Sequence, residues 1–142
     1  MLRARVLVAD DHKLIRDRIV HLLKSEFEVL QAVRDGQTLL DVAARLKPDV
    51  CVLDISMPVM SGIETAAQLT QSSSPPKIIF LTVHDDLDFV RAAFETGAKG
   101  YVIKARMAAD LLEAVREVLA GRTFLSPFGG AAPRPVRTKS SK

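Results

Sequence analysis

An apolar run ends on a carboxylate in the stretch CVLDISMPVMSG, residues 51–62. Residues 50–53 are apolar throughout, which favours a buried strand, and Asp54 follows directly. Ser61 is a good N-cap for a helix over residues 62–71, because its hydroxyl can accept a hydrogen bond from a free N–H group of the first turn. The stretch therefore predicts a strand, then a loop that begins with an acid, then a helix.

The same alternation of strand and helix repeats along most of the chain. Short apolar runs predict strands, and apolar positions at helical spacing predict helices. The expected strands cover residues 5–9, 27–33, 49–54, 77–82 and 100–104, and the expected helices cover residues 13–25, 38–46, 62–71, 85–97 and 109–121. Strands that alternate with helices predict an α/β fold, in which right-handed crossovers build one parallel sheet covered on both faces.

The composition is that of one globular domain. The chain has 142 residues, of which 48% are hydrophobic and 26% are charged, and this length is enough for a core. No apolar run approaches the length of a membrane span, and no signal peptide opens the chain. The single Cys51 stands in an apolar strand and is expected to be a core residue in a reducing compartment. We therefore expect a cytoplasmic protein without membrane contact.

Charge divides the chain into two parts. The net charge is +3, but the five charged residues after Ala120 are all basic, namely Arg122, Arg134, Arg137, Lys139 and Lys142. The preceding part is mildly acidic. We predict one domain over residues 1–121 and a basic tail, rich in Pro, Gly and Ser and largely disordered, over residues 122–142.

Acidic residues follow two of the predicted strands at the point where each ends. Asp10 and Asp11 follow the first strand, and Asp54 ends the third. Ligands of open parallel sheets lie beyond the carboxyl ends of the strands, so the three carboxylates converge on one pocket if these strands are adjacent. Each pair of like charges costs on the order of 1–4 kcal/mol at the dielectric of a protein surface, so the cluster must take up protons or a cation. Oxygen ligands with room for water favour Mg²⁺.

Two further polar residues end strands at the same edge of the sheet. Thr82 ends the fourth strand and Lys104 ends the fifth. An acid nucleophile, a divalent cation, a lysine and a hydroxyl together suit phosphoryl transfer, because each can stabilise charge on the transferring oxygens. His12, His21 and His84 lack metal-ligand spacing and are interpreted as ordinary surface or loop residues.

These motifs resemble those of the response-regulator receiver domain of two-component signalling, over about residues 3–121. They are the acid pair in ADDH, the acceptor in LDISMPVMSG, the threonine in LTVHD and the lysine in GYVIK. The resemblance implies a flavodoxin-like (βα)5 fold, a doubly wound parallel sheet with strand order 2-1-3-4-5. The segments LTVHD, GAKGYVIK and AGRTFLSP are most similar to the NarL/FixJ branch, whose members usually continue into a DNA-binding helix-turn-helix.

The resemblance implies a role for each polar residue of the pocket. Asp54 would accept a phosphoryl group from a histidine kinase or a phosphotransfer protein. Mg²⁺ would be held by Asp10, Asp11, Asp54 and the backbone carbonyl of Ser56. Lys104 would contact the phosphoryl group. The chemistry is directed at the chain itself, so we do not expect an enzyme that turns over a free substrate.

The resemblance also implies a conformational switch. Thr82 would contact the phosphoryl group, and Tyr101 would rotate inward into the space that Thr82 leaves. The face made by the fourth helix, fifth strand and fifth helix would then change for an output partner or for a homodimer formed on phosphorylation. Ser56 and His84 would border the path of the water that hydrolyses the acyl phosphate, and they would set its lifetime.

The chain departs from the family pattern at two places. Ala105 follows Lys104, where the family commonly has proline. The 22 residues after Ala120 are too few for a helix-turn-helix. We therefore expect a single-domain response regulator, or the isolated receiver of a DNA-binding transcriptional regulator.

Other functions fit the sequence less well. An aspartate-nucleophile phosphohydrolase needs a second acid two residues after the nucleophile, where Ser56 stands, and a substrate pocket. A flavin- or dinucleotide-binding domain needs a first loop rich in Gly, Ser or Thr, whereas Asp10 and Asp11 would repel a phosphate. Nucleic acid could bind weakly and without sequence preference through the basic tail.

Overall fold

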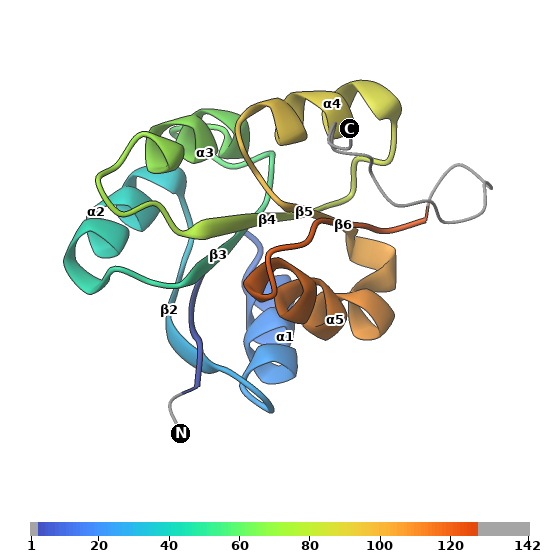
Figure 1. The fold of residues 1–142 in the computed structure, drawn as a ribbon, viewed down its shortest axis with the longest axis horizontal. Helices are drawn as coiled ribbons and strands as arrows, with labels where there is room; N and C mark the ends of the chain where they lie inside the picture. The colour runs from blue at the N-terminus through green and yellow to red at the C-terminus, as the bar shows by residue number, and fades with distance from the viewer. Residues whose placement is uncertain (1–2, 128–142) are drawn as a thin grey trace.

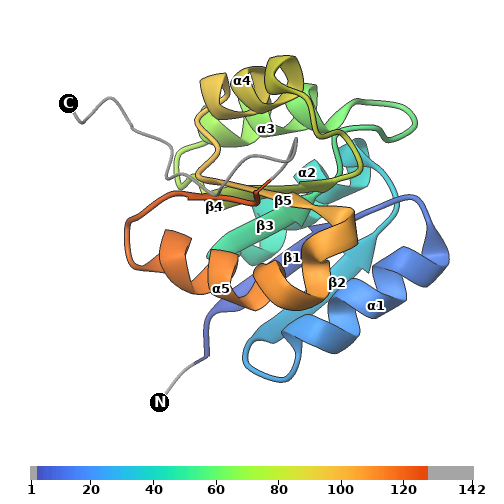
Figure 2. The ribbon, with the colours of Figure 1, turned by 90° about the vertical axis from the view of Figure 1, so that its right-hand side faces the viewer.

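The structure, a computed structural model, describes residues 3–127. Within these residues six parallel strands form one sheet in the order β2-β1-β3-β4-β5-β6, with helices on both faces (Figures 1 and 2). The strands are β1 (Arg5–Ala9), β2 (Glu28–Val33), β3 (Val50–Leu53), β4 (Lys77–Thr82), β5 (Gly100–Ile103) and β6 (Phe124–Leu125). The helices are α1 (Lys13–Leu23), α2 (Gly36–Leu46), α3 (Gly62–Thr70), α4 (Leu87–Glu95), the 3-10 turn η1 (Lys104–Arg106) and α5 (Met107–Leu119). No helix of this part of the chain is long and apolar enough to cross a bilayer.

The five predicted strands form in the predicted order, so the doubly wound α/β fold is confirmed. The sixth strand was not predicted. It pairs in parallel with β5, placing Phe124 beside Gly100 and Leu125 beside Tyr101. β6 lies beyond the domain boundary expected at residue 121, inside the segment assigned to the tail. The rest of that segment, residues 128–142, lies outside the described residues.

Two apolar clusters, one on each face of the sheet, form the core. Helices α2, α3 and α4 cover one face, and α1 and α5 cover the other (Figure 1). Alternate residues of each strand point to opposite faces, so β3 gives Cys51 and Leu53 to the first cluster and Val50 and Val52 to the second. All four of these side chains are fully buried, as expected for a central strand of a covered parallel sheet.

Cys51 is a core residue, as predicted. Burial raises the pKa of its thiol to about 12, so the group stays protonated and unreactive at neutral pH.

Helices α3 and α4, which follow the loops after β3 and β4, each begin with a side-chain N-cap. Ser61 Oγ accepts from the N–H of Glu64 at 3.1 Å, which confirms the predicted cap of α3. Asp86 Oδ1 accepts from the N–H of Phe89 at 3.1 Å and caps α4. Both caps fix where the helices start, and hence the lengths of the loops that follow β3 and β4.

Every peptide bond that the structure describes is trans, including the bond between Lys104 and Ala105. The chain passes from β5 directly into η1 and then into α5. Lys104 therefore sits at the junction between a strand and a helical turn.

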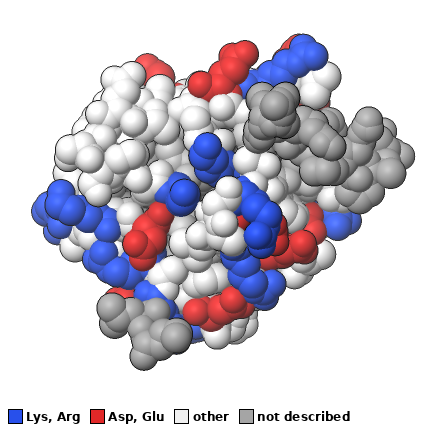
Figure 3. Space-filling model, in the orientation of Figure 1, with Lys and Arg blue, Asp and Glu red and all other residues white. Residues whose placement is uncertain are grey.

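Charged side chains of both signs are interspersed on the face shown in Figure 3. Ion pairs between oppositely charged side chains of the receiver include Arg116 with Glu26 at 2.9 Å and Arg122 with Glu117 at 2.6 Å. This face therefore carries no continuous basic surface of the kind that binds nucleic acid.

Candidate functional site

Three carboxylates meet where β1 and β3 end side by side. Asp10 follows β1 and is fully buried, Asp54 follows β3 and is 5% exposed, and Asp11 is exposed at the rim. One ligand atom from each of these residues lies within 4.8 Å of the others. The convergence expected from adjacent strand ends is therefore present in the structure.

Lys104 reaches across the sheet edge from the end of β5 to the buried acids. Its Nζ donates a hydrogen bond to Asp54 Oδ2 at 2.9 Å and lies 2.7 Å from Asp10 Oδ2, with only 9% of the side chain exposed. Burial alone would lower the pKa of this ammonium group, but its contacts with Asp10 and Asp54 outweigh burial and the pKa is raised. Lys104 is therefore charged and partly offsets the repulsion between the two buried carboxylates.

Thr82 ends β4 and His84 lies two residues further on, in the loop after β4. Thr82 is fully buried, and its Oγ1 accepts from the N–H of His84 at 3.4 Å. Ser56 Oγ lies within hydrogen-bond distance of His84 Nε2, at 2.8 Å, and the Ser56 N–H donates to Asp54 Oδ1 at 3.3 Å. The imidazole also stacks on Phe89, with ring centroids 3.9 Å apart. These contacts join the loop after β3 to the loop after β4 beside Asp54.

Tyr101 is fully buried on the α4 side of β5. Its hydroxyl donates to the carbonyl oxygen of His84 at 2.8 Å, and its ring lies near that of Phe94, with centroids 6.5 Å apart. Burial, together with the negative charges of Asp86, Asp85 and Asp54, raises the pKa of the phenol. The inward orientation expected to follow phosphorylation is therefore already present in this structure.

Gly62 lets α3 start directly against the backbone of Asp54. A Cβ atom at this position would lie 1.9 Å from the backbone oxygen of Asp54, so no side chain fits without moving that loop. The Gly62 N–H donates to the carbonyl of Ile55 at 2.7 Å. In the same loop Val59 has φ of +73°, a conformation that a β-branched residue rarely adopts, and its side chain is 83% exposed.

Comparison with known families shows which family has this fold and this arrangement of polar residues. The Response regulator receiver domain family matches residues 6–116. The chain belongs to this family. The structural neighbours agree with the assignment. The signal receiver domain of NarL from Mycobacterium tuberculosis superposes with a TM-score of 0.82 and 31% identity, covering 86% of this chain and all of that one. The receiver CheY4 of Vibrio cholerae gives 0.76 and 29%, covering 82% and 98%.

The curated relatives are longer than this receiver. It is 34% identical over 127 residues to the transcriptional regulatory protein DegU of Brevibacillus brevis, covering 88% of this chain and 54% of DegU. It is 36% identical over 126 residues to the response regulator GacA of Pseudomonas aeruginosa, covering 87% and 58%. The chain thus spans little more than half the length of the curated relatives it matches.

Two histidines of the receiver contact the site, although the sequence analysis interpreted both as ordinary surface or loop residues. His12 Nδ1 lies 3.2 Å from Asp11 Oδ1 and 3.7 Å from Asp10 Oδ1. His84 contacts Ser56, as described above. His12 is exposed at the N-cap of α1, so it is a surface residue as interpreted, but its contact with the acids was not predicted. For His12, its position directly after the acid pair was a signal that the spacing rule for metal ligands did not use.

The acid cluster fits a hard divalent cation. Carboxylate oxygens of Asp10, Asp11 and Asp54 lie within 4.8 Å of one another, and the buried Asp10 Oδ2 lies 2.7 Å from Lys104 Nζ. Three carboxylates share this one ammonium group, so the cluster keeps negative charge that a divalent cation can neutralise. The cluster can therefore hold a metal ion, as predicted.

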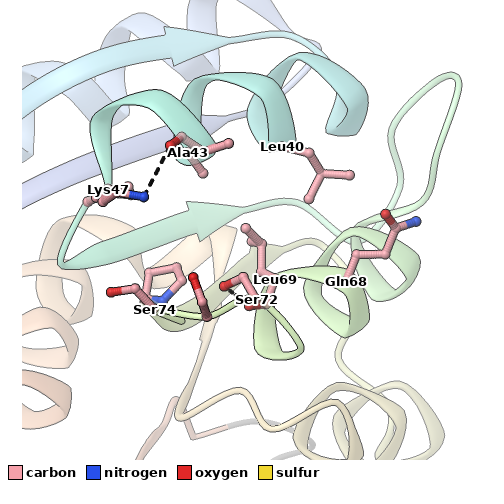
Figure 4. Close-up of a pocket in the computed structure, with 11 residues that line it drawn as sticks. Leu40, Ala43, Lys47, Gln68, Leu69, Ser72 and Ser74 are labelled. Carbon is pink, nitrogen blue, oxygen red and sulfur yellow. Dashed lines mark hydrogen bonds between the residues drawn. The ribbon is translucent and has the colours of Figure 1, made fainter.

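Two hollows differ in their relation to this site. An open hollow of about 650 Å³ adjoins the acids and is lined in part by Asp11, Ser56 and Phe89. A more enclosed hollow of about 170 Å³ lies between the C-terminal halves of α2 and α3, bordered by Leu40 and Leu69, with no carboxylate in its lining (Figure 4). Of these two, the open hollow is the one that borders Ile55 and Ser56, the residues directly after Asp54.

Proposed function

We propose that Asp54 is the phosphoacceptor of this receiver and that a phosphohistidine of a histidine kinase or a phosphotransfer protein is the donor. The observation that carries the proposal is the buried contact of 2.9 Å between Lys104 Nζ and Asp54 Oδ2. A carboxylate oxygen of Asp54 attacks the phosphorus, the new O–P bond forms, and the P–N bond to the donor imidazole breaks. The electron pair of that bond stays on the imidazole nitrogen, which leaves as the neutral ring after taking up a proton.

The cation in this proposal is Mg²⁺, held by Asp10, Asp11, Asp54 and the backbone carbonyl of Ser56. When bound, Mg²⁺ neutralises charge on the transferring phosphoryl oxygens. The Lys104 ammonium, positioned against Asp54 in the present structure, follows the charge onto the phosphoryl group. Chemistry of this kind modifies the chain itself, so phosphorylation and self-dephosphorylation change its state without turning over a free substrate.

Phosphorylation then acts on the face made by α4, β5 and α5. The phosphoryl group adds roughly two negative charges beside Thr82, whose hydroxyl can turn toward it. Thr82 and Tyr101 meet at His84, because the backbone of His84 contacts both side chains. A shift of Thr82 therefore changes the carbonyl that holds Tyr101, and the switch is read by an output partner or by a second copy of the receiver.

The donor docks at the carboxyl edge of the sheet in this proposal. Four apolar side chains are exposed around that edge, namely Leu14 (83%), Val59 (83%), Val83 (67%) and Leu87 (50%). They lie in the first turn of α1, in the loops after β3 and β4 and at the start of α4, at the end of the sheet where Asp54 follows β3, so a partner that covers them would bring its histidine to the acceptor. Exposed apolar groups ringing a polar centre are typical of interaction sites. We place this exchange in the cytoplasm, where the kinase domains would lie.

A second candidate is that the receiver regulates transcription as part of a longer DNA-binding protein. It is supported by the transcriptional role printed in the name of DegU and by the 54% of DegU that the chain covers. The receiver surface in Figure 3 offers no continuous basic patch for DNA. In this candidate, DNA contact would come from a part of that longer protein beyond the receiver.

Incubation with acetyl phosphate and Mg²⁺ tests the acceptor. We expect a mass increase of one phosphoryl group, removed by hydroxylamine as expected of an acyl phosphate, in the natural sequence but not in Asp54→Asn. Asp54→Asn should stay folded, because it removes one of three repelling charges and leaves Lys104 paired with Asp10. Incorporation of phosphate into Asp54→Asn would refute the assignment.

A further inference from the structure

The chain returns to the sheet after α5 and lies along the edge of β5 as β6 (Figures 1 and 2). The Phe124 N–H donates to the carbonyl of Lys99 at 3.0 Å, and the Ser126 N–H donates to the carbonyl of Tyr101 at 2.9 Å. The outer edge of β5 is therefore occupied by the receiver's own C-terminal segment.

Ser126 fixes this segment through a buried polar network. Its hydroxyl donates to Asp110 Oδ2 at 2.7 Å and accepts from the N–H of Ile103 at 3.1 Å. Ser126 is fully buried and Asp110 is 4% exposed, and Arg106 holds the same carboxylate with two hydrogen bonds of 2.7 and 3.1 Å. Loss of one partner from such a network leaves a buried group unsatisfied, so the network specifies one position for the strand.

Leu125 lies beside Tyr101 in the register of the two parallel strands. Residues in register share a face of the sheet, and Leu125 packs against the same apolar cluster that contains Tyr101 and Phe94. A Tyr101 ring that left its buried position would have to swing outward past the edge of β5 on this face. Leu125 occupies that edge.

We propose that β6 holds Tyr101 in its buried orientation and thereby presets the receiver toward the state that phosphorylation of Asp54 favours. This inference rests on the switch described under the proposed function. The coupling is reciprocal: if docked β6 and a phosphorylated Asp54 both favour buried Tyr101, each stabilises the other. The link is short, because Ile103, whose N–H binds Ser126, directly precedes Lys104 in the chain.

The composition of the chain makes the test direct. Tyr101 is the only tyrosine and there is no tryptophan, so ultraviolet-excited fluorescence of the full chain reports on this one ring. Quenching by acrylamide measures how accessible the ring is. The variants are Ser126→Ala, which removes the buried hydroxyl, and Leu125→Ala, which empties the space beside the ring.

The matched control is Ser72→Ala, which removes a serine hydroxyl that donates to the carbonyl of Leu69 at 2.7 Å, far from β5. We expect the quenching constant of Tyr101 to rise several-fold in Ser126→Ala and Leu125→Ala, with unchanged far-ultraviolet circular dichroism, and to stay constant in Ser72→Ala. Half-maximal phosphorylation by acetyl phosphate should need a higher concentration in the two β6 variants. If Ser126→Ala loses its fold, Leu125→Ala decides the matter alone, since its side chain is only partly buried.

Failure of this inference can be told from failure of the proposed function. Unchanged quenching in a folded Leu125→Ala that still accepts phosphate at Asp54 overturns the role of β6 and leaves the acceptor assignment intact. The same acetyl phosphate concentration for half-maximal phosphorylation in all variants would also overturn the proposal that β6 presets the receiver. A natural chain that takes no phosphate at Asp54 refutes the proposed function, while the quenching data still decide whether β6 holds Tyr101.

Discussion

Ser56 Oγ and His84 Nε2 lie 2.8 Å apart, and this contact joins the two loops that flank Asp54. The imidazole is held in place by its stacking on Phe89. In the function proposed above, this pair would stand beside the path of a water that reaches a phosphorylated Asp54.

We expect slow self-dephosphorylation for this reason. Ser56 is short, and the His84 ring shields the phosphorus rather than orienting a water. Replacing the pair by an amide and an acid, Ser56→Asn with His84→Glu, should shorten the lifetime of the phosphorylated form several-fold, which corresponds to about 1 kcal/mol of barrier. Decay is followed by intact mass with Mg²⁺ present and again after chelation. A natural sequence that decays as fast as the double variant would show that these positions do not set the rate.

Lys104→Met should destabilise the receiver strongly. The change leaves Asp10 and Asp54 buried without their ammonium partner, and loss of one member of a buried ion pair costs roughly 3–5 kcal/mol. The exposed pair of Lys13 with Asp17 at 2.8 Å gives the control, since Lys13→Met should change the free energy of unfolding by less than about 1 kcal/mol. Urea titration measures both variants.

Mg²⁺ should stabilise Lys104→Met more than the natural chain, because the cation then replaces the missing positive charge. The comparison is the shift of the urea midpoint on adding Mg²⁺. An equal shift in both proteins would mean that ammonium and metal do not compete for the same acids.

Alkaline pH should unfold the receiver as Tyr101 ionises. The pKa values of Tyr101 and Lys104 are both raised in the folded state, so the folded state holds these protons more tightly than the unfolded chain. Their contribution to stability is complete below the unfolded pKa values, about 10 to 10.4, and is lost as pH rises above them. Phenolate absorbance and circular dichroism should therefore change together. If the phenolate absorbance appears while the circular dichroism signal stays that of the folded receiver, this expectation is contradicted.

Val59→Gly should stabilise the receiver. A left-handed conformation costs an L-residue about 1–2 kcal/mol that glycine avoids. The greater chain entropy of glycine in the unfolded state offsets roughly 0.5–1 kcal/mol of this gain. The net gain is about 0.5–1 kcal/mol, because Val59 is 83% exposed and its side chain contributes little to apolar packing. Val83→Gly is the matched control, since Val83 is 67% exposed and has no left-handed φ, and it should destabilise the receiver. Urea midpoints that move the same way in both variants would show that backbone strain at Val59 does not limit stability.

The sheet could be predicted because each central strand is a compact apolar run that ends on a polar residue. In β3 every side chain is buried, so the pattern of the sequence and the packing agree. The meeting of Asp10 with Asp54 followed from the same rule, because the ends of adjacent parallel strands share one edge.

The contacts that could not be predicted depend on tertiary packing rather than on local pattern. β6 has two residues, too few for a period, and it is fixed by the network around Ser126. His84 meets Ser56 only because two loops, 28 residues apart in sequence, come together. Tyr101 is buried in this structure because its hydroxyl donates to the His84 carbonyl and its ring packs in the apolar cluster.

The short β6 also covers the backbone at the β5 side of the sheet. Without it, β5 would present its backbone at the margin of the sheet, and all four residues of Gly100–Ile103 are apolar or small and buried. Such a margin is a template on which another chain can add a strand. With β6 docked, the edge strand on this side of the sheet has two residues. A receiver that ends before Phe124 should therefore aggregate more readily than the full chain, even where its fold survives.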